Sequence, residues 1–102
     1  MKNLIDAAKL AQNNAHTPYS KYKVGAAILS EDNTIISGCN VESSSYGLTC
    51  CAERVAIFSA IAQGHNQFKA LAVITHNGGT PCGACRQVIW DLCGNIPIYI
   101  SC

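Results

Sequence analysis

The sequence predicts an α/β fold in which a mixed sheet of about four strands is flanked by helices. The first observation is that helical and strand patterns alternate along the chain, in the order α-β-β-α-β-α-β. The second is composition, because 49% of the residues are hydrophobic and 13% are charged, which excludes a disordered chain. The 102 residues are expected to form one domain, 1–102, around one core.

The first helix is expected over residues 2–15, because apolar side chains recur there at a spacing that puts them on one helical face. These side chains are Leu4, Ala8, Ala11 and Ala15. The pair Thr17-Pro18 should end this helix, since a residue that precedes proline is pushed out of the α conformation.

Two strands are expected next, over residues 24–29 and 34–41. The polar turn at 30–33 lies between them, so they are predicted to form a hairpin. A second helix is predicted over residues 50–63, and Gly64 is a natural stop just past its end.

The continuously apolar run at 70–75 predicts a strand that is covered on both faces. A third helix is expected over residues 82–93, with Pro81 before it and Gly94 after it. The final strand is expected over residues 96–101 and, because of a proline near its start, at a sheet edge. Since both later crossovers carry helices, the central strand pairings are predicted to be parallel, with right-handed connections.

Charge and hydropathy argue against a polynucleotide-binding protein, a membrane-spanning protein and an exported protein. The formal net charge is +1, from seven Lys and Arg against six Asp and Glu, and no basic stripe stands out, so a polynucleotide partner is not expected. No apolar run approaches the roughly 20 residues that a membrane span needs. Asp6 and Lys9 interrupt any apolar signal segment at the N-terminus, which predicts a cytoplasmic protein.

Cysteine is frequent in this short chain. The odd number of cysteines and the expected reducing compartment argue against a disulfide framework and favour metal binding by those that cluster. Cys39, Cys93 and Cys102 are interpreted as small buried hydrophobic residues. The seven cysteines are Cys39, Cys50, Cys51, Cys82, Cys85, Cys93 and Cys102.

Two cysteine motifs stand at predicted helix starts: CAER at 51–54 and PCGACR at 81–86. Cys82 and Cys85 are three residues apart, so their sulfur atoms share a face of one helical turn, and Cys51 supplies a third thiolate from the other helix. Three protein ligands with one open position are typical of catalytic zinc. A structural zinc that is closed by a fourth cysteine, such as Cys50 or Cys39, is the alternative.

Charged side chains next to Cys51 suit a hydrolytic site. Glu53 lies in the first helical turn and is expected to face the open position without binding the metal. Three thiolates leave a zinc ion with net negative charge, which the positive ends of two helix dipoles would partly offset. Arg54 is expected to donate hydrogen bonds to the thiolates, and Arg86 is a weaker candidate for that role.

A Cys-x-Glu motif followed by Pro-Cys-x-x-Cys is a signature of zinc deaminases. The chain resembles the cytidine deaminase family, in its small branch with all-cysteine zinc ligands. The resemblance extends over essentially the whole chain. It also rests on PYSKYKVGAA at 18–27, GCNVE at 38–42 and PCGACRQV at 81–88. It implies a three-layer α-β-α fold with the mixed sheet in the middle.

The resemblance also implies an activity and roles for individual residues. The activity would be zinc-dependent hydrolytic deamination of cytidine or 2′-deoxycytidine, in pyrimidine salvage, by a homotetramer. Glu53 would move the proton, and Asn40 and Glu42 would bind the ribose hydroxyls. The zinc ligands would be Cys51, Cys82 and Cys85, and the remaining substrate contacts would be Tyr22, Ala52 and, in a neighbouring subunit's pocket, Tyr46.

Two other interpretations remain open. The first is a deaminase of another aminated base or nucleoside analogue, of the blasticidin type, although the Asn40-x-Glu42 pair favours a ribose. The second is a catalytically silent, zinc-stabilised module. It arises because family members usually continue past the final strand with a further strand and a helical segment, whereas this sequence ends at Cys102.

Overall fold

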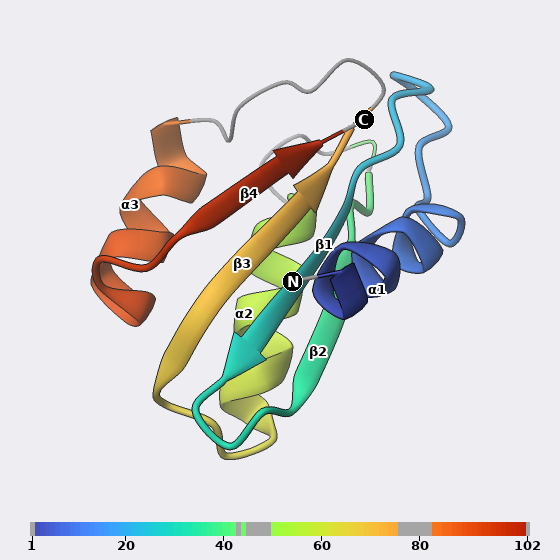
Figure 1. Cartoon of the computed structure of the whole chain (residues 1–102). Coiled ribbons are helices and arrows are strands. Elements are labelled where there is room, and N and C mark those ends of the chain that lie inside the picture. The colour runs from blue at the N-terminus through green and yellow to red at the C-terminus, as the bar shows by residue number, and fades with distance from the viewer. Residues whose placement is uncertain (1, 43, 45–49, 76–82, 102) are drawn as a thin grey trace.

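A four-stranded sheet in the order β2-β1-β3-β4 has α1 on one face and α2 and α3 on the other (Figure 1). This computed structural model describes residues 2–42, 44, 50–75 and 83–101. The elements are α1 (Lys2–Gln12), β1 (Gly25–Ser30), β2 (Ile35–Cys39), α2 (Ala52–Ala62), β3 (Phe68–Ile74), α3 (Gly83–Cys93) and β4 (Ile98–Ser101). The predicted order of elements and the three-layer α/β arrangement are therefore confirmed.

The pairing of the strands matches the sequence prediction in part. β1 and β2 form the expected antiparallel hairpin, and β3 and β4 are parallel. The central pair, β1 and β3, is antiparallel, so the prediction of parallel central pairings is wrong there. The reason is that the crossover through α2 passes over β1: β3 runs parallel to β2 but is hydrogen-bonded to β1, which lies between them.

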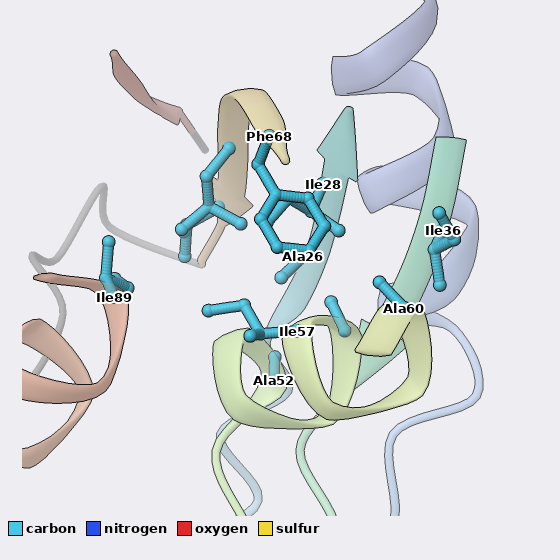
Figure 2. Close-up of a cluster of buried hydrophobic side chains, with 11 residues drawn as sticks. Ala26, Ile28, Ile36, Ala52, Ile57, Ala60, Phe68 and Ile89 are labelled. Carbon is cyan, nitrogen blue, oxygen red and sulfur yellow. The ribbon is translucent and has the colours of Figure 1, made fainter. Parts of the chain in front are cut away.

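The side chains of the sheet alternate between two cores. Ala26 and Ile28 of β1 lie on the sheet face that α2 and α3 cover. They belong to one core with Ile57 of α2 and Ile89 of α3 (Figure 2). Ala27, the residue between them, faces α1 instead. This alternation is the two-residue period of a strand that is covered on both faces, which explains why β1 and β3 read as continuous apolar runs.

The helix ends follow from local chemistry. The first helix was predicted to reach residue 15 but ends at Gln12. Asn13 and Asn14 are weak helix formers, and the backbone hydrogen bonds of the next turn span three residues and not four. Gly64 and Gly94 follow α2 and α3 with φ angles of 97° and 74°, and glycine adopts this left-handed region without strain.

The starts of α2 and α3 lie at the upper end of the molecule in Figure 1. β2, β3 and β4 finish there, and α2 and α3 begin there, close to the carboxyl ends of the strands. In open α/β sheets this edge is where ligands bind. In the part of the chain that the structure describes, no helix is long and apolar enough to cross a bilayer.

Candidate active site at the starts of α2 and α3

Cys51 is the residue immediately before α2. It occupies the N-cap position with extended backbone angles, and its side chain makes no capping hydrogen bond to the helix. Its carbonyl accepts the first intrahelical bond, from Val55 N at 3.0 Å. The thiol is therefore placed at the positive end of the helix dipole, where a thiolate is stabilised.

Arg54 contacts this thiol from the first turn of α2, and Glu53 lies in the same turn. The guanidinium Nη2 of Arg54 donates to Cys51 Sγ at 3.6 Å. The Glu53 side chain is buried, with 4% of the residue exposed. A cationic donor on the sulfur favours the thiolate form that zinc requires, so the surroundings of Cys51 suit one ligand of a zinc ion.

Two backbone hydrogen bonds join Val41, two residues past the end of β2, to the residue before Cys51. Val41 N donates to Cys50 O at 3.0 Å, and Cys50 N donates to Val41 O at 2.9 Å. Asn40 and Glu42 flank Val41, so this antiparallel bridge places both beside the start of α2. Residues that are about ten positions apart in the sequence thus meet beside the carboxyl end of β2.

Asn40 uses its amide to hold the chain segment that leads into β1. Its Nδ2 donates to Tyr22 O at 2.7 Å, and its Oδ1 accepts from Val24 N at 2.9 Å. An amide nitrogen has two hydrogens and an amide oxygen two lone pairs, so each atom keeps capacity for a further partner.

Glu42 holds the same segment further upstream. Its Oε1 accepts from the backbone nitrogens of Tyr19 and Ser20, both at 3.1 Å, and its Oε2 accepts a close hydrogen bond from the Ser20 hydroxyl. The Ser20 hydroxyl is the main reason that the pKa of the Glu42 carboxyl lies below its ordinary value. The nearby His16 lowers this pKa less.

The other predicted substrate contacts differ in how the structure describes them. Tyr22 is half-buried in the loop that Asn40 and Glu42 hold. Ala52 is completely buried in the core beneath α2, so a ligand would meet its backbone at the helix start. Tyr46 lies outside the described residues.

The second cysteine motif is described only in part. Cys82 lies outside the described residues, and Cys85 is described only as backbone in the first turn of α3. Within the described ranges, no group of three potential ligand side chains is present. Burial raises the pKa of the Cys93 thiol to about 11, and also raises that of Cys39, as suits small half-buried apolar side chains.

Sequence reasoning missed two contributors to this region. The Ser20 hydroxyl donates a hydrogen bond to the Glu42 carboxylate, although sequence reasoning predicted no role for this serine. His16 N donates to Asn40 O at 3.0 Å, and Glu42 N donates to His16 O at 2.8 Å, which adds a short parallel bridge beside β2. A serine two residues after a proline is a turn signal, but nothing local to it points to a carboxylate 22 residues away.

Comparisons with known proteins agree with this geometry. Residues 1–99 match the model of the cytidine and deoxycytidylate deaminase zinc-binding region. A cytidine deaminase from Sporosarcina psychrophila is 51% identical over 104 residues, which cover 99% of this chain and 76% of the relative. The crystal structure of cytidine deaminase from Burkholderia pseudomallei superposes with a TM-score of 0.93 at 47% identity, covering 97% of this chain and 82% of that one. More distantly, a blasticidin-S deaminase from Bacillus cereus is 34% identical over 82 residues, 71% of this chain and 59% of the relative.

The fold and the cysteine motifs at two helix starts define this chain as a zinc-dependent deaminase domain. Zinc is its cofactor. It belongs to the cytidine and deoxycytidylate deaminase family.

Proposed function

We propose that this protein hydrolyses the exocyclic amine of cytidine, and of 2′-deoxycytidine, to give the uridine product and ammonia. The observation that carries the proposal is the buried carboxylate of Glu53, in the same helical turn as the Cys51 thiol and its Arg54 partner. Relatives that are about half identical over nearly the whole chain are named cytidine deaminases, which supports this substrate.

Cys51, Cys82 and Cys85 would hold the zinc ion. When bound, zinc supplies a Lewis acid that lowers the pKa of a water molecule. Arg54, which donates to the Cys51 sulfur, would offset part of the negative charge that three thiolates would gather. The positive ends of the α2 and α3 dipoles would also offset this negative charge, since both helices begin at this end of the sheet.

Glu53 would carry the protons. Its carboxylate takes a proton from the attacking water and delivers it to N3 of the base as the new C4–O bond forms. It then takes the second proton of that oxygen to the amine, and the C4–N bond breaks with release of ammonia. Burial suits this work, because it keeps bulk water away from the carboxylate while the protons are transferred.

Asn40 and Glu42 would bind the ribose hydroxyls with the capacity that their backbone contacts leave free. Tyr22 would pack against the pyrimidine ring from the loop they hold, and the backbone of Ala52 would face the base. Holding the sugar converts binding far from the reaction into orientation at C4.

The test of the reaction is the loss of cytidine absorbance, followed for the parent and for Glu53→Gln. We expect turnover to fall at least about 100-fold in this variant, as is usual when a proton carrier is removed, while bound zinc persists. Glu31→Gln is the matched control, because Glu31 is an exposed carboxylate in the turn at the opposite end of the sheet. Turnover by Glu53→Gln near the parental rate would refute the assigned role.

A deaminase of the blasticidin type is the second candidate, and the similarity to blasticidin-S deaminase favours it. A panel of cytidine, free cytosine and blasticidin S separates the two. Preference for cytidine supports the proposal, and preference for blasticidin S replaces it. Given the net charge of +1, no polynucleotide binding is expected at physiological salt.

The proposal includes pyrimidine salvage in the cytoplasm by a homotetramer. A reducing compartment suits thiols that must stay available as metal ligands. Tetramer formation is supported by large apolar side chains exposed on α2 and α3, namely Phe58, Ile61 and Trp90. Light scattering tests it: a mass of four chains supports the assembly, and a monomer at micromolar concentration contradicts it.

A further inference from the structure

The loop from Thr17 to Val24 is fastened by a continuous chain of hydrogen bonds that begins at Glu42 and ends at Val24. The Glu42 carboxylate accepts from the Ser20 hydroxyl, and Ser20 Oγ accepts from Tyr22 N at 3.1 Å. The Tyr22 carbonyl accepts from Asn40, which accepts in turn from Val24 N. The side chains of Asn40 and Glu42 are thereby linked to each other through Ser20 and the backbone of Tyr22.

Ser20 is the member of this chain that joins Glu42 to Tyr22. A hydroxyl has one hydrogen to donate, and here that hydrogen goes to Glu42 Oε2. The same oxygen accepts from the backbone of Tyr22, so a single atom contacts both the carboxylate and the backbone that carries the tyrosine. Lys21, which lies between Ser20 and Tyr22, has a φ of 60°. This left-handed conformation turns the chain back towards Ser20.

We propose that Ser20 is a positioning residue for the nucleoside, which holds the Glu42 carboxylate in the orientation that receives the sugar hydroxyls. This inference rests on the proposed role of Glu42 in sugar binding. Without the hydroxyl, Glu42 keeps its two bonds to backbone nitrogens through Oε1, but Oε2 loses its partner and is no longer held in one orientation. Ser20 and Glu42 are near the surface, so water replaces the lost bond and the fold is retained.

The expected consequence is a change in substrate binding. Ser20→Ala should lower kcat/KM for cytidine about tenfold, mostly through KM, as when one hydrogen bond to a charged group is lost. Ser20→Thr keeps the hydroxyl and should restore most of the loss. Ser37→Ala, at an exposed serine on β2, is the matched control and should behave as the parent.

The decisive comparison uses 2′,3′-dideoxycytidine, which lacks the 2′- and 3′-hydroxyls of the sugar and keeps only the 5′-hydroxyl. If Ser20 acts by orienting Glu42, Ser20→Ala should cost about tenfold with cytidine and less than about twofold with the dideoxynucleoside. An equal loss with both substrates would show a general effect on the loop and overturn the inference, as would an unchanged kcat/KM for cytidine. A parent that does not turn over cytidine at all would instead refute the proposed function, and the inference with it.

Discussion

Gly38 and Ala56 bring β2 and α2 into direct backbone contact. A methyl group at position 38 would stand 2.5 Å from Ala56 N and 2.9 Å from Ala52 O, both closer than real side-chain carbons approach. The first turn of α2, which carries Glu53, therefore sits against the strand that leads to Asn40 and Glu42. The distance between Glu53 and the pair Asn40 and Glu42 therefore depends on the absence of a side chain at position 38.

Gly38→Ala should lower the free energy of unfolding by about 2 kcal/mol, because the helix must move away from the strand to admit the methyl group. Urea unfolding measures the loss. Ser37→Ala, next to it and exposed, should leave stability within about 0.5 kcal/mol. Equal stability of Gly38→Ala and the parent would contradict the close contact.

Arg54→Leu should weaken zinc binding roughly 10- to 100-fold, as loss of a group that holds a metal ligand commonly does. The cause is removal of the donor on Cys51 Sγ. Competition with a chromogenic chelator measures the affinity. Arg86→Leu should have a smaller effect, because Arg86 is exposed and has no described contact with a cysteine; the reverse order would show that Arg86 is the partner of the thiolates.

The Glu42 carboxyl should titrate below its ordinary pKa of 4.5, because the Ser20 hydroxyl and two backbone nitrogens bond its charged form. A group with a lowered pKa in the folded state adds stability that is complete above about 4.5 and is lost as pH falls through the lowered value. Ser20→Ala should move this pKa up towards 4.5. NMR titration of the carboxyl carbon measures both, and an identical pKa in parent and variant would show that the hydroxyl bond has no effect.

Lys21 has a φ of 60°, which β-branched residues adopt at a high cost and asparagine tolerates. Lys21→Val should therefore lower the free energy of unfolding by about 1–2 kcal/mol, whereas Lys21→Asn should leave it nearly unchanged. Lys23→Val is the control, since Lys23 is also exposed but does not have a positive φ. Thermal unfolding compares the three, and equal values for the two valine variants would contradict the left-handed turn.

Much of the architecture follows from local sequence patterns. The helical spacing of Leu4, Ala8 and Ala11 predicted the buried face of α1, and Gly64 and Gly94 predicted the ends of α2 and α3. The pairing of β1 with β3 was mispredicted. A crossover helix indicates that two strands run parallel, but not whether a third strand lies between them.

The kinds of elements, their order and the cysteine motifs at the two helix starts can all be inferred from local sequence, because periodicity, caps and metal-ligand spacing are properties of neighbouring residues. The pairs of distant groups that meet become known only from the folded chain: Val41 with Cys50, Gly38 with Ala56, and Ser20 with Glu42. The physical reason is that these contacts depend on how the helices pack on the two faces of the sheet and on the order of its strands. Both are settled by burial of the whole core and not by any short stretch of chain.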